Sequence, residues 1–178
     1  MAVSDISLFL IAEIPGFTPN VGRLVSMMNY VRAKTLGAVA GLTVDQLDYL
    51  HDARSNSIGA LLSHIASAEA GYQAHTLYGR GLTDEEKHEW GAAIELGDRA
   101  RNEIRGHDLA HYLGRLEQVR AKTLEELRKR NDQWLDERAA MANGGEVNNY
   151  FMWFHVFGHE INHRGQISWL KARTARVE

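Results

Sequence analysis

The sequence has no cysteine among its 178 residues. Disulfides, thiolate metal ligands and a nucleophilic thiol of the chain's own are therefore excluded. Any metal ion would have to be held by histidine, aspartate or glutamate. The nine histidines are accordingly the first residues to consider as ligands.

The chain also lacks an excess of one charge and a long apolar run. Twenty Lys and Arg residues stand against 23 Asp and Glu residues, whereas neutralising nucleic-acid phosphates usually demands a positive excess. The longest apolar stretch, residues 6–12, is interrupted by Ser7 and has no basic residue before it, unlike a secretory signal or a membrane span. We expect a cytoplasmic protein whose partners include neither nucleic acid nor a membrane.

Proline is nearly absent, since only Pro15 and Pro19 occur, so long helices are permitted afterwards. With 44% hydrophobic residues and this length, we expect one domain over residues 1–178. Apolar residues recur at helical spacing in four long segments, and no segment shows sustained alternation of β-branched residues. The four predicted helices span residues 19–39, 58–77, 109–130 and 150–173.

Capping residues support these boundaries. Thr18 precedes Pro19, Asp108 precedes the third long helix, and Asn148 or Asn149 precedes the fourth. Gly41 ends the first long helix, and Asn143-Gly144-Gly145 predicts the turn before the last one.

Two capping boxes predict short helices between the long ones. Thr43 with Gln46 opens a helix that ends near His51, and Thr83 with Glu86 opens a short helix in the polar segment 82–105. The pattern predicts an all-α fold, namely a four-helix bundle with a crossover connection between its second and third helices.

The last predicted helix carries His155, His159 and His163 on successive turns, and we expect this row to point into the bundle. Two imidazoles at i and i+4 can reach one cation, but they need a ligand from another helix. His64 is the best candidate, because Ala60, Ala68 and Gly71 around it leave room for a cavity. His155 lies at the edge of this face. Three roles stay open for it: a metal ligand, a residue that supports the ligands, or a core residue.

The same residues spell His159-Glu160-x-x-His163, a motif of metallopeptidases in which the glutamate activates a zinc-bound water. Such enzymes usually take a third ligand from downstream, where the only carboxylate side chain is Glu178. Glu160 lies about 120° around the helix from the histidine pair. We therefore expect Glu160 to be a solvated surface charge, and we disfavour a peptidase.

Three stretches of the chain, residues 57–69, 119–124 and 159–167, resemble the DinB-like family of metal-binding four-helix bundles. This DinB/YfiT-like group is related to DUF664 and to bacillithiol and mycothiol S-transferases. The resemblance extends over about residues 21–170. It implies that His64, His159 and His163 bind a divalent metal ion, with zinc or nickel expected. His155, Gln166 and Glu69 are candidates for supporting the ligands or lining the pocket.

Three histidines leave a coordination position open, which is typical of a catalytic site. The resemblance implies a thiol-dependent transferase that uses an external low-molecular-weight thiol and a small electrophile. Two alternatives stay open: hydrolysis by a metal-bound hydroxide, and a metal-binding stress-response protein without turnover.

The last predicted helix is also apolar away from its histidines, where it carries Phe151, Trp153, Phe154, Phe157 and Ile161. A homodimer would bury this second face. The alternative is that the N-terminal residues Leu8, Phe9, Leu10 and Ile11 cover it.

Overall fold

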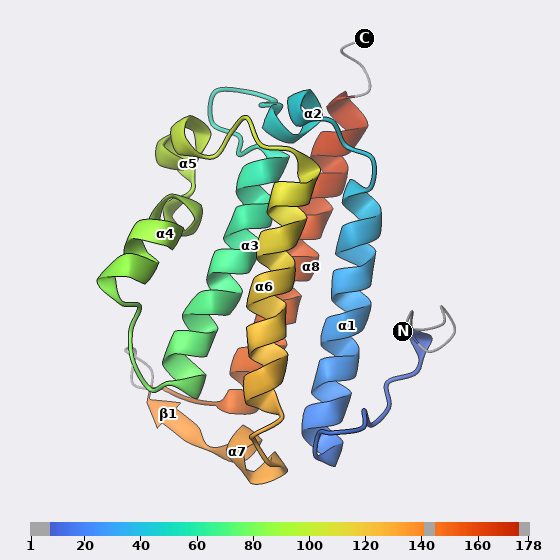
Figure 1. The fold of residues 1–178 in the computed structure, drawn as a ribbon, viewed down its shortest axis with the longest axis vertical. Helices are drawn as coiled ribbons and strands as arrows, with labels where there is room; N and C mark the ends of the chain where they lie inside the picture. Colours follow the sequence, from blue (N-terminus) through green and yellow to red (C-terminus); the bar gives the residue numbers. More distant parts are fainter. Residues whose placement is uncertain (1–7, 141–144, 175–178) are drawn as a thin grey trace.

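Four long helices lie side by side in the computed structural model, which describes residues 8–140 and 145–174 (Figure 1). They are α1 (Pro19–Val39), α3 (Ile58–Tyr72), α6 (Leu109–Leu127) and α8 (Asn149–Thr174). The predicted all-α fold is therefore confirmed. Asn143 and Gly144 of the predicted turn, and the terminal Glu178, lie outside the described residues.

The long helices run in two directions (Figure 1). α1 and α8 run one way, and α3 and α6 run the other. Because α3 and α6 are parallel neighbours, the chain must return past α3 before α6 begins. It returns through α4 (Asp84–Glu95) and α5 (Gly97–Glu103), where the sequence predicted one short helix. α4 packs against α3, and this contact matters for the candidate site.

Side-chain caps explain most helix starts. Thr43 and Thr83 form the predicted capping boxes at α2 (Val44–Asp48) and α4, and the Asp108 carboxylate accepts from His111 N at α6. α1 begins at the predicted residue, but its capping oxygen comes from far along the chain. Asp132 Oδ1 accepts from Asn20 N at 3.0 Å and from Val21 N at 3.2 Å.

Several short elements were not predicted. The predicted 58–77 helix is α-helical only to Tyr72 and continues as the π-helical turn η2 (Gln73–Leu77). After α6 come α7 (Asp132–Asp136) and a small antiparallel hairpin of β1 (Arg138–Ala140) and β2 (Glu146–Asn148). Three-residue strands are too short to show the alternation by which strands are recognised in a sequence.

The face of α8 turned away from the histidines is only partly exposed. Trp153 and Phe157 are buried in a cluster with residues of α1 such as Leu24 and Met28, so the chain itself covers this half of the predicted second face. Phe151 is exposed, but its ring stacks on His155, so this residue lies on the histidine side of α8 and not on the face where it was expected. Phe154 and Ile161 stay exposed, as do Phe9, Leu10 and Ile11. The Phe9 ring instead lies edge-on against Tyr30 of α1.

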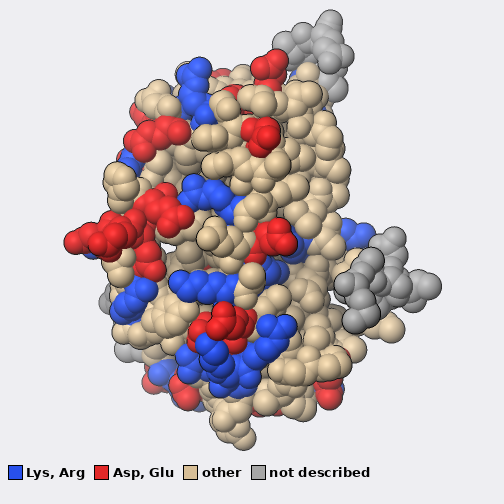
Figure 2. All heavy atoms as spheres, viewed as in Figure 1, with Lys and Arg blue, Asp and Glu red and all other residues tan. Residues whose placement is uncertain are grey.

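Basic and acidic side chains are interspersed over the face drawn in Figure 2. This face, over α4, α5 and α6, has no extended basic surface. In residues 8–140 and 145–174, none of the helices combines the length and the apolar character needed to cross a lipid bilayer.

Candidate metal centre

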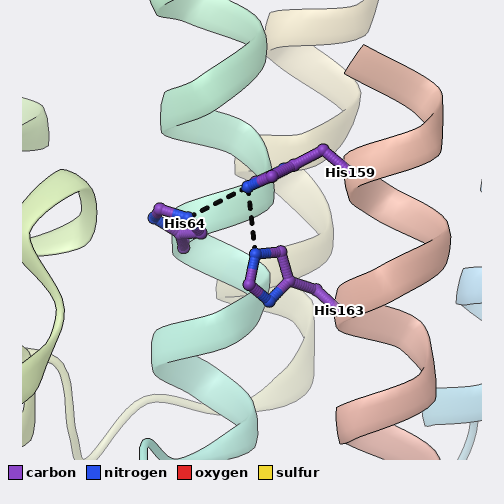
Figure 3. A group of neighbouring side chains, drawn as sticks. All are labelled: His64, His159 and His163. Carbon is purple, nitrogen blue, oxygen red and sulfur yellow. Dashed lines mark hydrogen bonds between the residues drawn. The ribbon is translucent and has the colours of Figure 1, made fainter. Parts of the chain in front are cut away.

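Three imidazoles from two helices meet at one point (Figure 3). His159 Nε2 lies 3.1 Å from His64 Nε2 and 3.0 Å from His163 Nε2. One ligand nitrogen from each ring lies within 4.8 Å of the other two. The i, i+4 spacing puts His159 and His163 on one face of α8, and the neighbouring helix α3 brings His64 opposite them. The structure therefore brings together the three histidines selected from the sequence.

In two of the rings the outer nitrogen, Nδ1, which points away from the centre, already donates a hydrogen bond. His64 Nδ1–H donates to the carbonyl oxygen of Ala93 in α4, at 2.8 Å. His163 Nδ1–H donates to Gln166 Oε1, also at 2.8 Å. A neutral imidazole has one N–H, so these two bonds leave the Nε2 lone pairs of His64 and His163 facing the centre.

The three inner nitrogens cannot satisfy one another. His159 has at most one Nε2–H to share, so at least one of the two Nε2 to Nε2 contacts places a lone pair against a lone pair. A shared cation removes this conflict. Nitrogen ligands of a tetrahedral zinc ion lie about 3.4 Å apart, as follows from a zinc–nitrogen bond of about 2.1 Å, so the rings fit with small movements.

Burial favours the neutral form of two of these imidazoles, His159 and His64. It lowers the pKa of His159 to about 4, helped by the neighbouring His163, His64 and His155 rings. Burial likewise lowers the pKa of His64, against the opposing effect of its bond to Ala93. Because a metal binds the unprotonated nitrogen, a lowered pKa keeps the rings in their ligand form at neutral pH.

The other candidate residues lie at different distances from the centre. Gln166 touches His163 through its side-chain oxygen. His155 is exposed; its ring centroid lies 6.2 Å from that of His159 and 5.9 Å from that of Tyr72. Glu69 faces away from the histidines and lies fully buried in the bundle interior.

Glu69 belongs to a buried network with one residue from each long helix. Arg120 Nε of α6 donates to Glu69 Oε1 of α3 at 2.7 Å. Arg32 of α1 donates from Nη2 to Glu69 Oε2 at 3.0 Å and from Nε to Glu160 Oε1 of α8 at 2.9 Å. All four side chains are less than 10% exposed. The network fixes how the four helices face one another.

The expectation that Glu160 is a solvated surface charge is therefore wrong, because its side chain is 1% exposed. The histidine row was expected to point into the bundle, but His155 is exposed and His159 and His163 are only half-buried. The 120° offset thus turns Glu160, not the histidines, toward the interior. Both Glu160 oxygens accept from arginines, so its carboxylate is not available as a base for a peptidase.

Sequence reasoning missed one partner of the metal centre, Ala93, and two residues of the buried network, Arg32 and Arg120. A backbone carbonyl such as that of Ala93 leaves no signal in a sequence. Arg32 and Arg120 did leave one, since each lies in the apolar stripe of its helix, where a charge needs a buried partner.

Two hollows flank the centre. One, of about 600 Å³, begins at His64 and extends past Tyr72 to Phe151. The other, of about 530 Å³, lies beyond Gln166 and is lined by polar side chains such as Arg54 and Asn162 together with the apolar Leu61, Trp169 and Leu170. Within the part of the chain that the structure describes, no carboxylate joins the three imidazoles.

A comparison with protein-family models identifies the family. The family model described as the DinB superfamily matches residues 27–167, well over half of the chain. The matched range includes all three histidines of the centre and all four residues of the buried network. A search of curated proteins finds no match.

Proposed function

The chain belongs to the DinB superfamily, and on that premise we propose that it is a divalent-metal-dependent enzyme that transfers an external low-molecular-weight thiol to a small electrophile. The observation that carries the proposal is the convergence of His64, His159 and His163 Nε2 atoms on one point. Zinc and nickel both suit three imidazoles. Three protein ligands leave one position open for a reactant.

The residues around the centre suit this role. His64 and His163 are fixed by their outer nitrogens, so the ligand set is largely formed before an ion arrives. A divalent ion held there would lower the pKa of a thiol at the open position and so favour the thiolate. Overall, R–SH and R′–X would become R–S–R′ and HX, which balances atoms and charge.

The thiol has to come from outside, because the sequence contains no cysteine. Bacillithiol, mycothiol and glutathione are the classes that family resemblance suggests. A metal ion would lower the pKa of a bound thiol so far that the proton could pass to solvent water without a base from the chain. Hydrolysis is less well supported, because protonation of the leaving group would favour an acid at the site, and Glu69 and Glu160 are both engaged in the interior.

The test uses the chain purified without a polyhistidine tag. We expect about one divalent ion per chain, and loss of free thiol above the uncatalysed rate when an electrophile and one of the three thiols are added. His64→Ala should lose both the ion and the activity. His155→Ala, which removes an exposed imidazole outside the trio, is the matched control and should keep both.

Two results would contradict the proposal. A full complement of metal with no consumption of any of the thiols would assign the chain to metal binding without turnover. Absence of metal from the wild type under all loading conditions would remove the site itself.

A further inference from the structure

The hollow that begins at His64 is mainly apolar. Small side chains of α3 form one wall, and the other walls come from α4, η2, β2 and the start of α8. Its lining includes Ala68, Gly71, Tyr72, Ile94, Phe151 and Met152. A hollow of about 600 Å³ with these walls has the size and polarity of a site for a small organic molecule.

The hollow and the metal centre share a wall. His64 lines the hollow and also directs its Nε2 to the centre, 3.1 Å from His159 Nε2. A molecule that filled the hollow would therefore have one end beside His64 and the metal centre. Tyr72 adds a polar group, and burial raises the pKa of its phenol, so it stays a hydrogen-bond donor at neutral pH.

We propose that this hollow binds the apolar part, an aromatic ring or alkyl chain, of the electrophile, so that the substrates are apolar electrophiles rather than polar metabolites. That the bound molecule is an electrophile rests on the proposed function, but the binding of an apolar group in the hollow does not require turnover. Low-molecular-weight thiols carry carboxylates, amides or hydroxyls, which are costly to bury against Ile94 and Phe151. The hollow beyond Gln166, with Arg54 and Asn162, is the one that suits such a polar thiol.

Gly71 offers a way to fill the hollow without touching the metal ligands. A Cβ built at Gly71 meets nothing within 4 Å, and Gly71 lines the hollow. Gly71→Leu should therefore fold and occupy the space that the apolar group needs. Gly114 of α6 also has open space around its Cβ, does not line the hollow and is exposed, so Gly114→Leu is the matched control.

The experiment follows the Met152 methyl group, which lines the hollow, in zinc-loaded full-length chain labelled with ¹³C at its methionine methyls. Benzyl alcohol, 2-phenylethanol and 3-phenylpropanol are the probes, because they are apolar and do not react. We expect the Met152 signal to shift and the affinity to rise about fourfold with each added methylene. Gly71→Leu should abolish the shift, and Gly114→Leu should keep it, while both retain zinc.

A Met152 signal that does not move with any alcohol, or Gly71→Leu binding the probes like the wild type, would overturn the inference. Its failure is distinguishable from failure of the proposed function. Loss of the Met152 response with thiol consumption intact removes only the apolar site. A normal Met152 response in a chain that consumes no thiol removes the transfer reaction and leaves the apolar site in place.

Discussion

At the scale of single residues, the hydrogen bonds of Nδ1 in His64 and His163 determine that the Nε2 atom of each ring carries a lone pair. Ala93 and Gln166 accept from the Nδ1–H groups of His64 and His163, and these bonds turn both Nε2 lone pairs toward the same point. Such partners raise the basicity of the ligand and hold its ring in position. The site therefore depends on more than its three imidazoles.

Gln166→Leu tests this dependence, because leucine keeps the bulk and removes the acceptor. We expect metal affinity to fall about 10- to 100-fold. Gln166→Glu retains an acceptor oxygen and should stay close to the wild type or bind more tightly. The measurement is competition with a chromophoric chelator at fixed neutral pH. Equal affinities for Gln166→Leu and the wild type would show that the bond to His163 contributes nothing.

At the scale of helices, boundaries with local causes could be predicted from the sequence. The capping boxes at Thr43 and Thr83 and the cap at Asp108 each depend on a side chain three residues from its partner. The cap of α1 by Asp132 joins residues 111 and 112 positions apart, so no local pattern reveals it. The same distinction explains why η2 was not predicted. Its π-helical turn continues a stripe of apolar residues whose spacing predicts an uninterrupted α-helix.

The site follows the same rule. The pairing of His159 with His163 is local and was predicted, and the addition of His64 followed from small neighbours and family resemblance. The rotation of α8 about its own axis was predicted wrongly, because several residues on each side of this helix are apolar. Trp153 and Phe157 pack against α1, and Glu160 joins the buried arginines, so these contacts decide the rotation of the helix.

The packing of α3 on α6 yields a prediction at this scale. A Cβ at Gly59 would lie 2.5 Å from the Tyr112 hydroxyl oxygen and 2.6 Å from its Cζ, and Tyr112 is buried. We expect Gly59→Ala to destabilise the chain by about 1–3 kcal/mol, since the two helices must move apart. Gly114→Ala, at an exposed helical position with open space, should instead stabilise by about 0.5–1 kcal/mol. Urea unfolding measures both, and an unchanged midpoint for Gly59→Ala would contradict the packing described.

At the scale of the whole molecule, two polar assemblies connect the helices. The network of Arg32, Glu69, Arg120 and Glu160 links all four long helices in the interior. The three histidines link α3 to α8 nearer the surface. We interpret the buried network as the feature that sets the arrangement of the helices. The three histidines form the candidate metal site, which depends on that arrangement.

The interior network makes stability depend on pH. Burial alone would raise the pKa of Glu69, but the charges of Arg120 and Arg32 outweigh burial and hold it below the ordinary 4.5. The folded state therefore binds the Glu69 proton more weakly than the unfolded state. The stabilisation is present above pH 4.5 and is lost as the pH falls below that value toward the folded pKa.

We expect the urea midpoint of the wild type to fall steeply on acidification below pH 4.5. Glu69→Gln should be less stable at neutral pH, because two buried arginines lose a charged partner. Its stability should change less over the acid range. Parallel pH curves for the two proteins would show that Glu69 does not carry the effect.

The measurement that tests the account most directly is X-ray absorption at the metal edge of zinc-loaded chain purified without a tag. The account predicts one zinc ion per chain, three imidazole nitrogens at about 2.0–2.1 Å and one exchangeable oxygen ligand from water. His64→Ala should show no bound zinc. A wild-type spectrum with fewer than three imidazoles, or zinc that dialysis removes completely, would contradict the claim that His64, His159 and His163 share one ion.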